Sequence, residues 1–272
     1  MLGDVMVGRD VHPSAETFAY LEPALEGADL VTGNLESPLT RARVQVASAY
    51  VLCAPPENAH YLAQAHFDLL TLANNHHLDC GVEGLLETRS VLTKAGIEAV
   101  GPDPQPVERT VNGLRLAFLA FDATQGFDLE AASSAVHSAY AQGAIVVVSM
   151  HWGVEYQGGA SAAQERMAAQ LAASGAALIW GHHPHVLQPA AWLNGGRTLV
   201  LYSLGNALFD QYGLASTRQS VLALVEVGKS GAVKLNVIPF VIDVRHSVIR
   251  APDAQQSAAI LQFFAEASAR AP

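Results

Sequence analysis

The sequence is short of basic residues. It has 15 lysines and arginines against 25 aspartates and glutamates, which gives a formal net charge of −10. It also contains no basic run and no arginine-rich helical segment. A protein that binds nucleic acid needs clustered positive charge to contact the phosphates. The composition therefore excludes nucleic acid as the main partner.

Cysteine and long apolar runs are equally scarce. Cys53 and Cys80 are the only cysteines, and they form neither a CxxC motif nor a disulfide framework. We therefore expect two ordinary small buried residues. No apolar run reaches about 18 residues, so no transmembrane helix is predicted. The first residues, "MLGDVMVG", lack a signal-peptide pattern. The chain as written would be cytoplasmic, or extracytoplasmic or membrane-associated if a leader is missing.

The sequence is rich in the hydrophobic residues that form a core and buried strands. Of its 272 residues, 50% are hydrophobic and 15% are charged, which excludes extensive disorder. Continuous runs rich in valine, leucine and isoleucine are typical of strands buried on both faces. These runs lie in "ADLVTGNLES", "FDLLTLANNHH", "RLAFLAFDA", "GAIVVVSMHWG", "AALIWGHHPH" and "TLVLYSLGN".

Helical patterns and turn signals separate these runs. Helices are predicted at residues 81–95 and 162–174, and a last helix begins at "PDAQQ", where Asp253 and Gln256 fit a capping box. Asn-Gly pairs at 112–113 and 194–195 predict tight turns, and strands 220–227 and 232–243 predict a hairpin. The class is therefore α/β with mixed sheets. No linker or repeat interrupts the chain, which we interpret as one domain of residues 1–272.

Polar side chains of ligand type follow strand after strand. Ligands of α/β proteins bind at the carboxyl ends of the strands, so we expect these residues to converge. Imidazole with carboxylate and amide oxygen suits Mn, Fe or Zn better than Ca or Mg. The strand-end residues are Asp4, Asn34, Glu36, Asn74, Asn75, His76, His151, Glu155, His182, His183, His185 and Asn206.

Each of these residues also has an ordinary structural interpretation. A single Asp or Asn after a strand is more often a turn or cap residue, and His151 beside Trp152 fits a half-buried histidine equally well. Three imidazoles within "GHHPH" are harder to explain, because burying them without partners is costly. Five other histidines stand outside these strand-end motifs and are interpreted as surface or structural residues, namely His12, His60, His66, His137 and His246.

The motifs together resemble the CapA (or PgsA) family, which is linked to poly-γ-glutamate capsule synthesis and whose domain resembles calcineurin-like metallophosphoesterases. They stand in the family's order between residues 3 and 211, as "GDVM", "GNLE", "ANNHHLDCG", "HWGVEY", "GHHPHV" and "YSLGNALFDQ". The resemblance implies a four-layer α/β/β/α sandwich of two mixed sheets flanked by helices. It also implies one or two divalent metal ions at the strand ends.

The resemblance assigns roles residue by residue. Asn75 resembles the metal-binding asparagine, His76 the histidine that faces the substrate, and His151 the next metal-binding histidine. The His-x-His of the last motif matches His183 and His185. The remaining residues of these motifs are expected to support the ligands or contact the substrate, and they are Asn34, Asn74, His182 and Asn206.

Two positions depart from the phosphoesterase pattern. Met6 stands where a histidine is expected, and Asn34 stands where a bridging aspartate is expected, so Glu36 would supply the acidic ligand. Met6 either leaves the second ion short of a ligand or simply packs in the core. One ion would be held firmly by Asn75, His151 and one of the histidines of "HPH". A second ion, near Asp4, Glu36 and the other histidine, would be weaker.

Three functional hypotheses follow from these residues. In the first, the protein is a metal-dependent hydrolase of a phosphate ester, with His76 protonating the leaving group. Arg218 would bind an anionic oxygen in that reaction, or would form a surface ion pair instead. In the second, it binds a polyanion such as polyglutamate, or serves capsule-synthesis proteins, without catalysis. The third is a metal-stabilised relic without activity. The charge of −10 suits a polyanion only where metal supplies positive charge.

Overall fold

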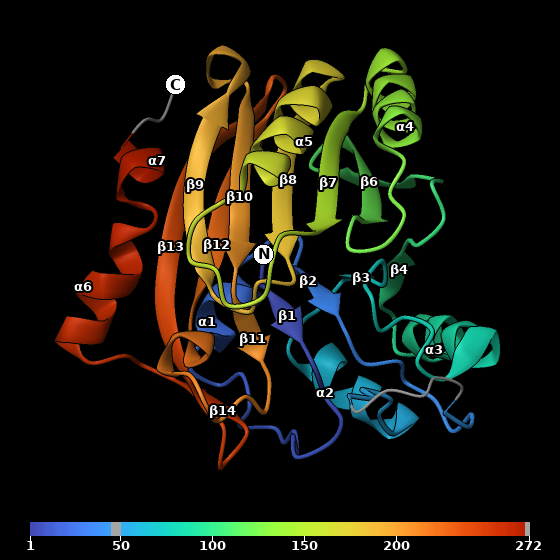
Figure 1. Ribbon diagram of the computed structural model, residues 1–272, viewed down its shortest axis with the longest axis vertical. Helices are drawn as coiled ribbons and strands as arrows, with labels where there is room; N and C mark the ends of the chain where they lie inside the picture. The colour runs from blue at the N-terminus through green and yellow to red at the C-terminus, as the bar shows by residue number, and fades with distance from the viewer. Residues whose placement is uncertain (45–49, 270–272) are drawn as a thin grey trace.

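The computed structural model describes residues 1–44 and 50–269. It is an α/β protein whose sheets are flanked by helices (Figure 1). The strands are β1 Asp4–Val5, β2 Thr32–Leu35, β3 Leu69–Thr71, β4 Glu98–Val100, β5 Val107–Val111, β6 Leu114–Asp122, β7 Ile145–His151, β8 Ala176–His182, β9 Leu187–Leu193, β10 Thr198–Leu204, β11 Asn206–Leu208, β12 Gln219–Gly228, β13 Gly231–Asp243 and β14 Val248–Arg250. The helices are α1 Glu22–Glu26, α2 Ala59–Gln64, α3 Gly81–Lys94, α4 Leu129–Ala141, α5 Ala162–Ala173, α6 Ala254–Gln262 and α7 Ala265–Ala269, with short 3-10 helices η1 Pro56–Asn58, η2 Asn194–Gly196 and η3 Ala215–Arg218.

One sheet is five-stranded, in the order β11-β1-β2-β3-β4, and all its neighbouring strands are parallel. A mixed sheet was expected here. The sheet is parallel because a helix lies between each pair of successive strands from β1 to β4, and a crossover of this kind returns the chain in the same direction. All five strands therefore deliver their carboxyl ends to the same edge.

The second sheet is six-stranded and mixed, in the order β5-β6-β7-β8-β10-β9. Its inner strands are parallel, while β5 and β9 pair antiparallel at the two edges. Both Asn-Gly turns of the sequence lie in these edge hairpins, and all four residues have positive φ, between 49° and 78°. Asparagine and glycine tolerate that conformation better than other residues, so the predicted turns are confirmed.

A third sheet, β12-β13-β14, is antiparallel and contains the predicted hairpin. The three predicted helices are also present as α3, α5 and α6, and α6 begins with the predicted capping box of Asp253 and Gln256. Among the described residues, no helix combines the length and the hydrophobicity needed to cross a membrane. The single domain of 1–272 remains a prediction, and its residues 45–49 and 270–272 lie outside the described part of the chain.

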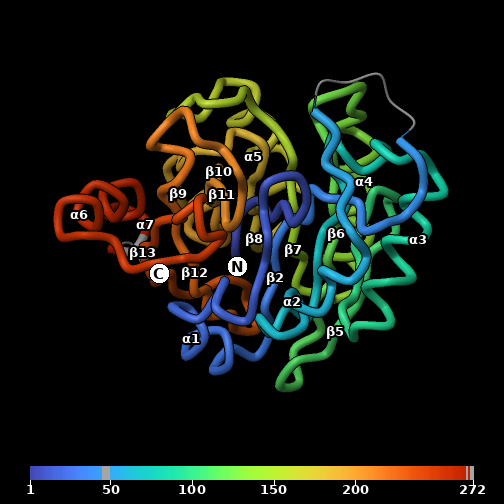
Figure 2. The backbone as a smooth tube through the Cα atoms, turned by 90° about the horizontal axis from the view of Figure 1, so that it is seen from below, coloured from blue at the N-terminus to red at the C-terminus, as the bar shows by residue number. Residues whose placement is uncertain are grey.

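Apolar residues cover both faces of the six-stranded sheet. Alternate residues of β7 show this: Val146 and Val148 pack in the cluster beneath α4 and α5, whereas Val147 packs in the cluster that includes β12, β13, α6 and α7. Seen from below, α6 and α7 lie on the side away from α3 and α4 (Figure 2). The predicted α/β sandwich with outer helices is confirmed.

The two cysteines correct one sequence expectation. Cys53 and Cys80 form a disulfide, with their Cα atoms 6.4 Å apart, rather than being separate buried thiols. Their separation of 27 residues matches no cysteine motif. The pairing comes from the fold, because the Leu52 backbone N–H donates to Asp79 Oδ2 at 2.8 Å and so holds Cys53 close to Cys80, the N-cap residue of α3.

Candidate metal centre

The strand-end residues meet where the carboxyl ends of the two larger sheets face each other. In the five-stranded sheet, Asp4 is the register partner of both Asn34 and Asn206. In the six-stranded sheet, His151 is level with His182. The arrowheads of β7 and β8 point toward the region of β1 and β2 (Figure 1). The predicted convergence is therefore present in the structure.

The alternation of a strand explains why His151 points into this region. Side chains two residues apart share a face of a strand, so Val147, Ser149 and His151 face the same way along β7. Val147 is in the inner core, and the Ser149 hydroxyl donates to Thr71 Oγ1 of β3 at 3.2 Å. His151 is the next residue on this face and is 0% exposed.

Asp4, Glu36 and His151 form one group of possible metal ligands, with ligand atoms within 4.8 Å of one another. His151 Nε2 lies 3.3 Å from Glu36 Oε1 and 2.8 Å from the side-chain oxygen of Asn75. From the sequence, Asp4 and Glu36 were expected around a second, weaker ion. The geometry instead groups them with His151.

The chemistry of this group fits a divalent cation. Glu36 is 0% exposed, and neither of its carboxylate oxygens has a hydrogen-bond donor among the described residues. Burial and the neighbouring charge of Asp4 raise the pKa of Glu36 well above its usual range. Burial lowers the pKa of His151 well below its usual range and so favours the neutral imidazole that binds metal. A buried carboxylate without a donor is costly unless a cation meets it.

Asn34 is fully engaged in hydrogen bonds. Its amide nitrogen donates to Asp4 Oδ1 at 2.9 Å, and its oxygen accepts from Thr71 Oγ1 and from Asn74 Nδ2, each at 3.2 Å. The Asn74 amide also donates to the Leu35 carbonyl at 2.9 Å. Asn34 therefore orients Asp4, and Glu36 is the acidic group with free oxygens in this segment.

His76 lies next to the centre and has its own carboxylate partner. Its Nδ1 is 2.9 Å from Asp79 Oδ2, and its backbone N–H donates to the Asn74 side chain at 3.1 Å. Asp79 also accepts from the Leu52 backbone N–H at 2.8 Å, in the segment that the disulfide joins to α3. This arrangement fixes the orientation of the imidazole ring.

The histidines of "GHHPH" take different places. His182 is buried, and its Nδ1 lies 3.2 Å from Asp4 Oδ1. The Nδ1 of His185 lies 3.4 Å from Asp4 Oδ2. The same nitrogen donates a hydrogen bond to Asn206 Oδ1 at 2.9 Å. Burial would lower the pKa of His185, but Glu36 and Asp4 outweigh it and raise the pKa to about 9. Burial lowers the pKa of His183. The His183 ring lies 4.9 Å from the His151 ring, centroid to centroid.

The pKa of Asp4 shows how these histidines act on it. Burial raises the pKa, but the hydrogen bonds and charges of His182 and His185 outweigh burial and hold it well below its usual range. Asp4 is therefore the ionised carboxylate of the centre. The two histidines also restrain its position, and the backbone N–H of His183 donates to its Oδ2 at 3.1 Å.

Met6 is 0% exposed and belongs to a hydrophobic core cluster. Its sulfur accepts from the backbone N–H of Gly8 at 3.1 Å. These contacts fit the core-packing interpretation of Met6 rather than a place among the ligands.

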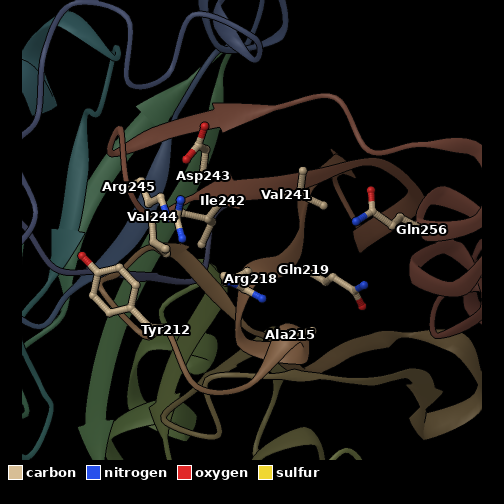
Figure 3. A pocket seen from close by; sticks show the side chains of 10 residues that line it. All are labelled: Tyr212, Ala215, Arg218, Gln219, Val241, Ile242, Asp243, Val244, Arg245 and Gln256. Carbon is tan, nitrogen blue, oxygen red and sulfur yellow. The ribbon is translucent and has the colours of Figure 1, made fainter.

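Arg9, rather than Arg218, is the arginine beside this centre. Arg218 lines a separate pocket of about 470 Å³ between η3 and β13, whose lining includes none of the metal-centre residues (Figure 3). Arg9 pairs with Asp210, and its guanidinium lies 5.6 Å from the Phe209 ring, which is 4.8 Å from the His185 ring. Sequence patterns gave no role to Arg9, because its partner is 201 positions away.

Comparison with known proteins gives a consistent family match. Residues 1–211 match the model of a family described as bacterial capsule synthesis protein PGA_cap. The PGA biosynthesis protein CapA of Bacillus subtilis (strain 168) is 33% identical over 280 residues, which cover 92% of this chain and 72% of that protein. The capsule biosynthesis protein CapA of Bacillus anthracis is 32% identical, with 88% of this chain and 66% of that protein covered.

More distant matches extend this similarity. A "probable polyglutamine synthesis accessory protein" of Mycobacterium tuberculosis is 24% identical over 270 residues, which cover 84% of this chain and 69% of that protein. Among solved structures, a hypothetical protein from Thermus thermophilus aligns with a TM-score of 0.57 at 15% identity, covering 81% of this chain and 91% of that chain. At that identity, the structural match supports a shared fold alone.

Proposed function

The chain belongs to the PGA_cap family of bacterial capsule synthesis proteins, and from this premise we propose that it is a metal-dependent phosphoesterase-like protein of capsule or poly-γ-glutamate synthesis. The observation that carries the proposal is the Glu36 carboxylate. It is buried without a hydrogen-bond donor among the described residues, and it faces His151 and His185 at 3.3 and 3.8 Å. Such a group is suited to hold a cation.

The residues that would hold the ion are Asp4, Glu36, His151 and Asn75. This set of carboxylate, imidazole and amide oxygen favours Mn, Fe or Zn over Ca. A divalent ion bound there would make hydroxide available near neutral pH and polarise a phosphate oxygen. Asn34 supports this role by holding Asp4, and Asn74 supports it by holding Asn34.

The protein's own residues would supply proton transfer and substrate orientation. His76, whose ring is oriented by Asp79, would protonate a leaving-group oxygen, which is a task that imidazole performs near neutral pH. Arg9 would orient an anionic oxygen of the substrate. Its pairing with Asp210 uses Nε and one terminal nitrogen, and the other terminal nitrogen, which makes no hydrogen bond to a described residue, would meet an anion.

The second candidate is a non-catalytic accessory that binds an anionic polymer or assembles with capsule-synthesis proteins. The neutral Asn34 and the core-packed Met6 favour it, because both replace groups that the resembled phosphoesterases use to hold two ions. The name of the Mycobacterium tuberculosis relative also describes that protein as an accessory.

A screen of phosphomonoesters and phosphodiesters with the Mn-loaded protein tests the first candidate. We expect turnover that His151→Ala reduces by at least about 100-fold, while His137→Ala, on the exposed face of α4, leaves turnover unchanged. Metal bound to the parent without turnover on any ester would reject the hydrolase and favour the accessory role. Equal turnover in both variants would show that His151 and the ion that it would hold take no part in the reaction.

A further inference from the structure

The pocket of about 470 Å³ that lies apart from the metal centre has both positive charge and apolar walls. Its lining comes from η3, from the paired strands β12 and β13, from the turn after β13 and from α6 (Figure 3). Ile242 and Val244 of this lining are buried and belong to a hydrophobic core cluster. Two arginines, Arg218 and Arg245, line the same pocket. This combination suits an anion that also carries an apolar part.

The two arginines of the pocket have no partner in the described part of the chain. Neither side chain makes a hydrogen bond or an ion pair with a described residue. Carboxylates are not scarce in this chain, which has 25 acidic and 15 basic residues. Other arginines pair with them, namely Arg9, Arg41, Arg89, Arg109, Arg115 and Arg250. The guanidinium groups of Arg218 and Arg245 are therefore free to donate paired hydrogen bonds to an external anion.

Asp243 contributes a carboxylate to the lining, but its charge is compensated by another residue. Its Oδ2 accepts from Arg250 Nε at 2.9 Å and lies 2.8 Å from His246 Nδ1. Burial raises the pKa of Asp243, but the hydrogen bonds of His246 and Arg250 outweigh burial and lower it. Asp243 is therefore ionised and paired with Arg250, which does not line the pocket. The charges of Arg218 and Arg245 remain uncompensated.

Hydrogen bonds hold the segments that supply donors to the pocket. In η3, the Thr217 carbonyl, next to Arg218, accepts from the Asn206 amide at 2.9 Å. In α6, the side-chain oxygen of Gln256 accepts from the Asp253 backbone N–H at 2.9 Å. The Gln256 amide nitrogen makes no hydrogen bond to a described residue, so it is free to donate to a ligand. Donors from two fixed elements therefore line the pocket, as an anion site requires.

We propose that this pocket binds a dicarboxylate, a ligand with two carboxylate groups on a short hydrocarbon chain, at a site separate from the metal centre. The two guanidinium groups match the two carboxylates. The aliphatic side chains of Val241, Ile242 and Val244 contact the methylene groups between them. Inorganic phosphate has no such apolar part. The inference goes beyond the proposed function and does not depend on bound metal, because the described lining includes none of the residues that would hold the ion.

Calorimetric titration of the full chain with glutarate tests this proposal, after dialysis has removed any metal that glutarate could bind. We expect saturable binding at millimolar glutarate. Arg218→Gln and Arg245→Gln should each weaken it at least about tenfold with an unchanged Tm, because each removes charge-assisted hydrogen bonds to the ligand and no internal contact. Arg166→Gln removes the same charge from an exposed position of α5 and should bind as the parent. Glutaramide, the uncharged analogue, should not bind.

The possible results separate this inference from the proposed function. No binding of glutarate to the parent, or parental affinity in both arginine variants, would overturn the proposal. Inorganic phosphate that displaces glutarate at equal concentration would overturn the assignment to a dicarboxylate. Binding that His151→Ala abolishes would place the ligand at the metal centre and overturn the separate site. A peptide of four glutamates identifies the source: displacement of glutarate by less peptide than glutarate supports the proposal with acidic side chains as the ligand, and weaker displacement supports it with a free dicarboxylate.

Discussion

Replacing Glu36 by glutamine should have opposite effects on the metal-free and the metal-bound protein. In the metal-free protein, Glu36 is 0% exposed and both its oxygens lack donors among the described residues. A buried polar group without partners costs about 1–3 kcal/mol. The neutral amide of Glu36→Gln should recover part of that free energy, which corresponds to a rise in Tm of roughly 2–4 °C per kcal/mol for a domain of this size.

The gain in stability from Glu36→Gln should depend on pH. The pKa of Glu36 is raised above its value in the unfolded chain. A carboxyl group with a raised pKa in the folded state destabilises the fold only above its unfolded pKa, and the penalty grows as pH rises through the folded pKa. The parent should therefore lose stability relative to Glu36→Gln between about pH 4.5 and neutral pH. At about pH 4 the two proteins should differ little.

Added metal should make the parent more stable than Glu36→Gln. A ligand at 100 times its Kd stabilises the parent by about 2.7 kcal/mol. If the loss of the carboxylate weakens binding by about 100-fold, the same metal concentration stabilises Glu36→Gln by only about 0.4 kcal/mol. The assay is urea unfolding at pH 8 with a chelator and then with Mn²⁺, compared for parent and variant.

Asn34→Ala is the matched control in the same segment. It removes the hydrogen bonds to Asp4, Thr71 and Asn74, so it should lower the stability of the metal-free protein. A metal-free Glu36→Gln that is less stable than the parent, or one with the parent's full stabilisation by metal, would refute the reasoning. Metal binding weakened only by Asn34→Ala would reverse the roles of the two residues.

Three other changes test separate parts of the structure. Arg9→Gln should weaken inhibition by inorganic phosphate about tenfold, because one charge-assisted hydrogen bond is lost. Arg218→Gln, in the separate pocket, should leave this inhibition unchanged. Equal inhibition constants in the two variants would contradict the role of Arg9. Serine at both Cys53 and Cys80 should reduce the free energy of unfolding by about 3.5 kcal/mol for a loop of 27 residues, and an unchanged urea midpoint would contradict this. Met6→His should lower Tm without tightening metal binding, because the side chain packs in the core; a tighter second event in calorimetry would show that it reaches the ions.

The position of the centre could be predicted from sequence because it depends on local patterns. An apolar run places the end of a strand, and parallel strands bring their ends to one edge. That is sufficient to bring Asp4, Glu36, His151 and His185 together before any contact is known. The hairpin turns and the capping box were predictable for the same reason, since each depends on residues close in the chain.

Contacts between distant segments could not be predicted in this way. The Arg9–Asp210 pair and the Cys53–Cys80 disulfide each join loops whose relative position is set by packing of the whole fold. Arg218 follows a motif closely in sequence, yet the chain turns through η3 and directs it to another pocket.

The most direct test of the proposed metal centre is a crystal structure of the Mn-loaded protein with an anomalous difference map at the Mn absorption edge. We predict a peak about 2.0–2.3 Å from a carboxylate oxygen of Glu36 and from ligand atoms of Asp4 and His151. A map from fully loaded crystals with no peak between these three side chains, or with an ion that Glu36 does not contact, would contradict this prediction.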